Sequence, residues 1–159
     1  MAGGKDVIDA ALRLLSYRPR SAHELTRRLA DKGFEAPEIK GAVGYLTDAG
    51  YLDDERYAAS LADSRVRNKG WGPSKISADL AAKGIPKEII KKTMARIGPA
   101  EEGTARAAFA RWARRNRVVD RPEGKVFEKV FRHLKARGFC TSAIMKALSR
   151  SGDEDGGGE

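Results

Sequence analysis

The sequence predicts an all-α protein of three tandem three-helix, helix-turn-helix-like repeats in an elongated, curved arrangement. A glycine-containing helix end recurs about every fifty residues, apolar residues recur at helical spacing around each glycine, and no stretch alternates as a strand would. The 159 residues are 41% hydrophobic and 33% charged. That balance is typical of a helical protein with a thin core and much surface.

The recurring segment reads as the end of one helix and the start of another. It spans Leu29–Phe34, Leu80–Ile85 and Leu134–Phe139, each with a glycine before the last apolar residue. Such a glycine adopts the left-handed conformation that closes a helix, and the apolar residue after it covers the helix end. Apolar residues also align eight positions before and six and ten after each glycine: Leu25, Ile76 and Val130; Ile39, Ile90 and Ile144; Val43, Met94 and Leu148.

A further amphipathic helix precedes each of these pairs, and helix-start signals agree with this division. Ser21 and Glu24 form a capping-box pattern, and Asp53 is placed to cap the helix that follows it. The predicted organisation is a first repeat at 5–52, a second at 53–98, a third and most basic repeat at 99–149, and a disordered, acidic, glycine-rich tail at 150–159.

The formal net charge of +9 favours a polyanionic partner such as nucleic acid, or an acidic protein surface. The charge is uneven along the chain. Residues 1–52 carry eight basic against seven acidic side chains, whereas residues 99–149 carry twelve against five. The third repeat is therefore the strongest candidate for contact with a polyanion.

Basic residues cluster between the first and second helix of each repeat. Arginine suits phosphate and carboxylate because its planar fork bonds two oxygens at once. A helix dipole alone accounts for one or two cations per helix end. The predicted binding residues are Arg18, Arg20, Arg65, Arg67, Lys69, Arg111, Arg114, Arg115, Arg117 and Arg121.

Other prominent side chains have structural interpretations. Lys32, Lys83 and Arg137 precede the three glycines and are interpreted as cations that match helix dipoles. Trp112 lies in an apolar stripe and is predicted to be core. Trp71 is in a glycine-rich loop, where packing onto the core and stacking on a base are both open.

No catalytic constellation is present, so the protein is predicted not to be an enzyme and to need no metal or cofactor. His23 and His133 are the only histidines and have no metal-ligand spacing. The segment Gly70–Lys75 lacks the spacing of a phosphate-binding loop, and Asp53–Glu55 is explained by helix capping. Cys140 is the only cysteine, and we expect it to be a small buried hydrophobe.

No apolar run approaches the roughly 18 residues of a membrane span. The start of the chain, Met1 to Asp6, does not read as a signal peptide. We therefore expect a soluble, cytoplasmic protein, and no helix suggests a dimer interface, so a monomer is expected.

Particular segments of the chain resemble the RecX family of bacterial regulators of the RecA recombinase. The resemblance rests on Gly50–Ala58, Gly72-Pro73 and Leu80–Ile85, and on Arg18–Ser21 in the first repeat. It covers residues 8–97 strongly and continues more loosely through the third glycine turn.

This resemblance implies helical tandem repeats that bind RecA, above all its filament on single-stranded DNA. It implies an inhibitor of ATP hydrolysis, strand exchange and coprotease activity, with a role in DNA repair and the SOS response. Whether such a protein contacts DNA directly, and whether it blocks filament growth or disassembles filaments, stays open. Two alternatives also stay open: a helix-turn-helix transcription regulator that binds duplex DNA, and an RNA- or protein-binding repeat scaffold.

Overall fold

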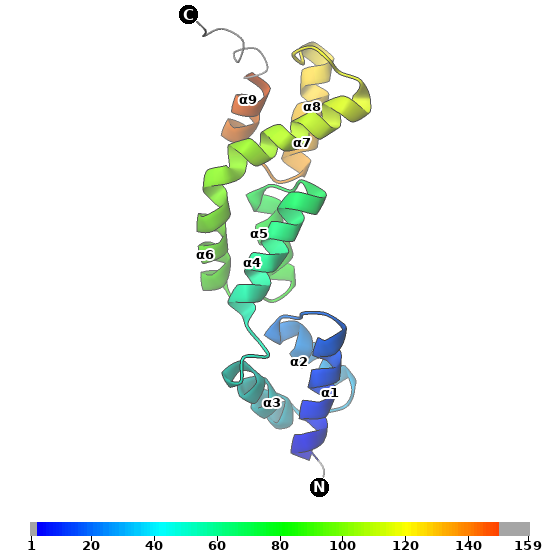
Figure 1. Ribbon diagram of the computed structural model, residues 1–159, viewed down its shortest axis with the longest axis vertical. Coiled ribbons are helices and arrows are strands. Elements are labelled where there is room, and N and C mark those ends of the chain that lie inside the picture. The colour runs from blue at the N-terminus through cyan, green and yellow to red at the C-terminus, as the bar shows by residue number, and fades with distance from the viewer. Residues whose placement is uncertain (1–2, 150–159) are drawn as a thin grey trace, which may run out of the picture. The chain divides into compact units, whose positions relative to one another are not determined.

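The computed structural model describes residues 3–149, and every regular element in that range is helical (Figure 1). The helices follow one another in three sets of three: α1 (Gly3–Tyr17), α2 (Ala22–Asp31) and α3 (Ala36–Asp48); α4 (Asp54–Ser64), α5 (Pro73–Ala82) and α6 (Lys87–Ile97); α7 (Glu101–Asn116), α8 (Gly124–Ala136) and α9 (Thr141–Ser149). This confirms the predicted all-α fold of three-helix repeats. The predicted disordered tail lies outside the described residues.

Two short elements extend helices of the middle repeat. A π-helical turn, Arg65–Lys69, continues α4, and a 3₁₀ turn, Gly98–Ala100, joins α6 to α7. None of the helices between residues 3 and 149 is long and apolar enough to cross a membrane.

The three glycine turns form as predicted. Gly33, Gly84 and Gly138 have φ of +92°, +74° and +94°, a region that a residue with a side chain rarely adopts. In each turn the apolar residue after the glycine donates its N–H to the carbonyl of the leucine five positions earlier: Phe34 to Leu29 (3.3 Å), Ile85 to Leu80 (3.1 Å) and Phe139 to Leu134 (3.3 Å). All three leucines are fully buried, so each turn fixes a core residue as it ends a helix.

The described chain divides into two compact units. One unit comprises the chain up to Leu61 together with Leu80–Thr93, and the other comprises Ala62–Asp79 together with the chain from Met94 onward. The core of the first unit is formed by α1, α2, α3 and the segment that follows α3, from Val7, Ala11, Leu25, Leu29, Ile39, Ala42, Leu46 and Leu52. The core of the second unit is formed by α7, α8, α9 and the turn between α8 and α9, from Ala105, Ala108, Phe109, Trp112, Val130, Leu134, Phe139, Ala143, Ile144, Ala147 and Leu148.

Within the first unit, the start of α2 contacts the glycine turn at the end of α5. The Ser21 hydroxyl donates to the carbonyl oxygen of Lys83 at 2.6 Å, although 62 residues separate them. A Cβ added to Gly84 would lie 2.3 Å from the His23 ring, so only glycine fits this contact in its present form.

Within the second unit, the start of α5 contacts the glycine turn at the end of α8. The N–H of Gly72 donates to the carbonyl of Arg137 at 2.7 Å, and that of Ser74 donates to Gly138 at 3.1 Å. Gly72 stands at the same place in its repeat as Ser21 does in the first, and Arg137 at the same place as Lys83. Each unit therefore contains one repeat junction, built on equivalent residues.

Helix caps follow the predictions in part. The Asp53 carboxylate accepts the N–H of Arg56 at 3.0 Å, and the Ser21 hydroxyl accepts that of Glu24 at 3.1 Å. The carboxylate of Glu24 pairs with Arg18 at 3.0 Å instead of completing the predicted capping box. A complete capping box is present instead at the start of a different helix, α3, where it is formed by Glu35 and Glu38.

Trp112 is buried in the second unit, as predicted, but the expectation for Cys140 was wrong. Cys140 is exposed at the start of α9, and its sulfur accepts the N–H of Ala143 at 3.4 Å. Its own N–H donates to the Glu101 carboxylate at 2.7 Å. The residue therefore caps a helix, a position where its side chain points out of the core.

Leu80→Ala is expected to lower the free energy of unfolding by about 2–5 kcal/mol, because the truncation leaves a cavity at a fully buried site. Lys83→Ala removes a partly exposed ammonium group 3.5 Å from Glu24 and is expected to cost less than ~1 kcal/mol. Urea unfolding followed by circular dichroism measures both. Equal, small effects would contradict the placement of Leu80 in the core.

Candidate functional site

The predicted basic residues of the first repeat are largely engaged within the protein. The Arg18 guanidinium pairs with Glu24 at 3.0 Å, and Arg20 donates to the carbonyl of Leu14 at 3.2 Å. Burial and the neighbouring Arg18 lower the pKa of Arg20. These two arginines support the local structure of the first unit, which weakens their candidacy as free binding groups.

The second predicted cluster lies on the π-helical turn Arg65–Lys69. Arg65 pairs with Asp79 at 2.7 Å, and its guanidinium carbon lies 5.2 Å from the centre of the Trp71 ring. The ammonium of Lys75 lies 4.5 Å from the same ring. Trp71 is thus half-buried among cations, while Arg67 and Lys69 remain exposed.

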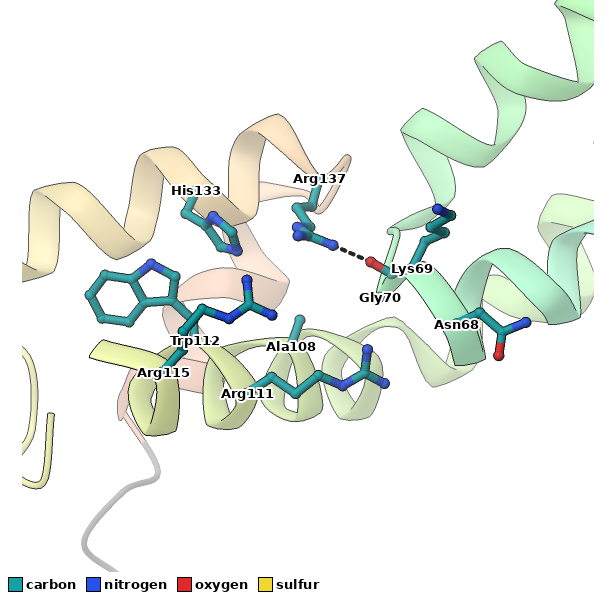
Figure 2. A pocket seen from close by; sticks show the side chains of 9 residues that line it. All are labelled: Asn68, Lys69, Gly70, Ala108, Arg111, Trp112, Arg115, His133 and Arg137. Carbon is teal, nitrogen blue, oxygen red and sulfur yellow. Dashed lines mark hydrogen bonds between the residues drawn. The ribbon is translucent and has the colours of Figure 1, made fainter. Parts of the chain in front are cut away.

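In the second unit, the structure brings part of this cluster together with part of the third one, around a pocket (Figure 2). Lys69 comes from the π-helical turn, Arg111 and Arg115 come from α7, and Arg137 comes from the end of α8. The complete lining is Asn68, Lys69, Gly70, Ala108, Arg111, Trp112, Arg115, His133 and Arg137. The lining contains four cations and no acidic side chain.

Two arginines of the pocket hold the π-helical turn in place. Arg111 Nη2 donates to the carbonyl of Arg67 at 3.0 Å, and Arg137 Nη1 donates to the carbonyl of Lys69, the bond drawn in Figure 2. These carbonyls stand at the C-terminal end of the turn, where helical partners are lacking. Gly70 ends the turn with φ of +62°, a backbone conformation that favours glycine.

Arg137 is the C-cap of α8, as the sequence suggested, but its side chain also has a role outside its own helix. Its guanidinium reaches the end of another helical turn, 68 residues earlier in the chain, and lines the pocket. His133 lines the pocket too, although its place in the sequence predicts no binding role. One signal pointed to Arg137: it is an arginine where the first two repeats have lysine, and only arginine has a planar fork of donors.

Arg115 is exposed, and no hydrogen bond or ion pair within residues 3–149 engages its side chain. Figure 2 shows that side chain rising from α7 toward His133. Arg114, Arg117 and Arg121 are also exposed but do not line the pocket. Arg117 ends α7 with φ of +56°, and its backbone N–H donates to the carbonyl of Arg114 at 3.3 Å.

The positive charge of the pocket affects the pKa of His133. Burial, followed by the charges of Arg137 and Arg115, lowers the pKa of this histidine below its ordinary 6.5. Its ring centre lies 6.3 Å from that of Trp112, which forms part of the wall. A partly desolvated, positively charged pocket of this kind is suited to an anionic group.

Among the described residues, no three His, Cys, Asp or Glu side chains lie close enough together to hold a metal ion. The charged groups of the pocket are one lysine and three arginines, and these repel a cation. The chemistry available at this site is therefore recognition of an anion.

The chain matches two models of one protein family, over most of its first two repeats. The model of the first three-helix domain of RecX matches residues 8–46, and that of the second matches residues 53–94. The regulatory protein RecX of Vibrio campbellii is 36% identical over 149 residues, which cover 92% of each chain. That of Mycobacterium leprae is 31% identical over 137 residues, covering 86% of this chain and 80% of the relative.

Solved structures agree in fold. The crystal structure of RecX from Lactobacillus salivarius superposes with a TM-score of 0.80 at 21% identity, covering 91% of this chain and 94% of that one. A second crystal structure of a regulatory protein RecX gives a TM-score of 0.81 at 22% identity. Together with the matches to both three-helix domains, these likenesses show that the chain belongs to the RecX family.

Proposed function

We propose that this protein binds the RecA filament on single-stranded DNA and limits its ATP hydrolysis, strand exchange and coprotease activity. Membership of a family of regulatory proteins supports a regulatory role rather than catalysis. The observation that carries the proposal is the acid-free pocket formed by Lys69, Arg111, Arg115 and Arg137. It offers a concentrated positive surface to a polyanionic assembly.

The protein acts in this proposal as a cytoplasmic monomer that contacts successive units of one polymer. Linked contacts of this kind multiply through effective concentration, so several weak sites give a strong total affinity. A filament offers many equivalent sites, whereas a free recombinase monomer offers one. Binding is therefore selective for the assembled filament.

The test is co-sedimentation with RecA, with and without single-stranded DNA and a slowly hydrolysed nucleotide. We expect co-sedimentation with the filament to exceed binding to free RecA by on the order of 10²-fold or more in affinity. Binding should also fall steeply as salt rises, since phosphate contacts release counterions.

Two results would contradict the proposal. Equal affinity for free RecA and for the filament would show that contacts with successive filament units do not contribute to binding. Tight, sequence-selective binding to duplex DNA without any effect of RecA would instead support a transcription regulator.

A further inference from the structure

The cations of the pocket differ from the arginines of this chain that form ion pairs. Some guanidinium groups of the chain pair with acidic side chains, as in Arg18–Glu24, Arg65–Asp79 and Arg106–Glu102. Around the pocket, by contrast, Lys69, Arg111, Arg115 and Arg137 lie together with no acid among the lining residues. Like charges held together without a counter-charge repel, and an anion between them relieves that repulsion.

The donors are partly fixed before any ligand arrives. Arg111 and Arg137 each use one N–H on a backbone carbonyl of the π-helical turn, which orients the guanidinium and leaves further donors on each. Arg115 remains without such a partner in the described chain. The pocket thus combines two oriented guanidinium groups with one that is available for a direct contact.

The shape of the pocket discriminates between the anions that arginine recognises. Its cationic residues come from three separate elements, the π-helical turn, α7 and the end of α8. A carboxylate presents two oxygens in one plane and is matched by a single guanidinium fork, whereas a phosphate presents oxygens in several directions. The cavity of about 170 Å³ is well above the roughly 10–15 Å³ that one water needs, so there is room for such a group.

We propose that this pocket binds a phosphate group of single-stranded DNA, with Arg115 in direct contact and Arg111 and Arg137 as its oriented neighbours. The protein then touches the DNA of the filament itself as well as the recombinase. This inference rests on the proposed function for its biological setting, but the site can be tested without recombinase.

The chain offers a matched pair of variants, Arg115→Gln and Arg114→Gln. Both residues lie in the last turn of α7 and both are exposed, but only Arg115 lines the pocket. Each change removes one positive charge at nearly the same distance from the helix end. If overall positive charge alone attracts the DNA, the two variants lose the same amount of DNA affinity. If the phosphate binds in the pocket, Arg115→Gln loses much more affinity than Arg114→Gln.

Binding is measured by fluorescence anisotropy of a labelled oligothymidylate with the full chain, after circular dichroism shows that each variant is folded. Arg115→Gln is expected to weaken binding by roughly tenfold or more, as loss of a charge-assisted hydrogen bond does. The slope of log affinity against log salt should fall in magnitude by about 0.7, the loss of one phosphate contact on a single strand. Arg114→Gln is expected to weaken binding by less than about threefold, through screened long-range attraction only.

Equal effects of the two variants, or no binding of the oligothymidylate by the parent, would overturn the phosphate site. A second arm measures inhibition of RecA ATP hydrolysis by the same proteins. If Arg115→Gln binds the oligothymidylate like the parent yet no longer inhibits RecA, the pocket receives an acidic surface of the recombinase, and the inference is wrong. If DNA binding depends on Arg115 but the parent does not inhibit RecA, the phosphate site stands and the proposed function falls.

Discussion

Gly138→Ala is expected to lower the free energy of unfolding by about 3–4 kcal/mol, from backbone strain of about 1–2 kcal/mol and two lost hydrogen bonds of about 1 kcal/mol each. A Cβ at this position would lie 2.4 Å from the backbone nitrogen of Lys75 and 2.6 Å from its Cβ. Neither atom is at the end of a flexible side chain. The start of α5 would have to move away, and the bonds that Gly72 and Ser74 donate to this turn would break.

Gly33→Ala is the matched control for this experiment. Gly33 has nearly the same φ, +92° against +94°, and ends a helix in the same way. No described atom lies within 4 Å of the Cβ that the change would add. It should therefore cost only the strain of a left-handed alanine, about 1–2 kcal/mol.

The two variants are compared by chemical denaturation, with the midpoint read at an unchanged slope. The difference between them, about 2 kcal/mol, measures the repeat junction separately from the turn. If Gly138→Ala costs no more than Gly33→Ala, the contact between the α8 turn and the start of α5 contributes nothing to stability.

The helices and their turns could be predicted because their signals are local. Each glycine turn is specified within about six residues, by a buried leucine, a glycine and an apolar residue that returns to the leucine carbonyl. Three copies of the same short pattern make a chance match improbable. The fold class and the buried positions Leu25, Ile76 and Val130 followed from that pattern, and all three are fully buried.

The repeat junctions could not be predicted, because the two use different donor groups for the same bond. In the first unit the donor is the hydroxyl of Ser21, and in the second it is the backbone N–H of Gly72. The residue type does not show whether a backbone N–H donates to a distant carbonyl, so the sequence does not indicate this bond. Only the three-dimensional arrangement shows that both groups bond to the residue before a glycine turn.

The candidate site was predicted in part, for a related reason. Charge clustering identified Lys69, Arg111 and Arg115, since these residues belong to dense basic segments. Arg137 and His133 belong to the α8 segment, where lysines and arginines are spread out rather than adjacent, and the role of Arg137 depends on contact with the π-helical turn, more than sixty residues away. Periodicity indicates which face of a helix is buried, but not which distant segment lies against it.

Reversal of Arg114, Arg115 and Arg117 to Glu is expected to weaken inhibition of RecA ATP hydrolysis by on the order of 10²-fold or more, as loss of one module of a linked interaction does. All three side chains are exposed at the end of α7, within the most basic repeat. The reversal turns the positive margin of the pocket negative, so a polyanion is repelled where it had been attracted.

Lys40, Lys87 and Lys91, reversed to Glu together, provide a control with the same change in net charge. These lysines are exposed and lie outside the basic clusters. Lys83 is less suitable because its ammonium lies 3.5 Å from Glu24. The control should weaken inhibition by less than about tenfold, since distant exposed charges are screened at physiological salt.

The assay is ATP hydrolysis on single-stranded DNA, titrated with each variant after circular dichroism shows that it is folded. Salt provides an internal check, because the difference between the two triple variants should shrink as ionic strength rises. Inhibition by the arginine variant at the parent's potency would show that the end of α7 is not part of the inhibitory surface. The protein would still belong to the RecX family, since that rests on the matches to its two three-helix domains and to RecX relatives, but its basic third repeat would then need another partner.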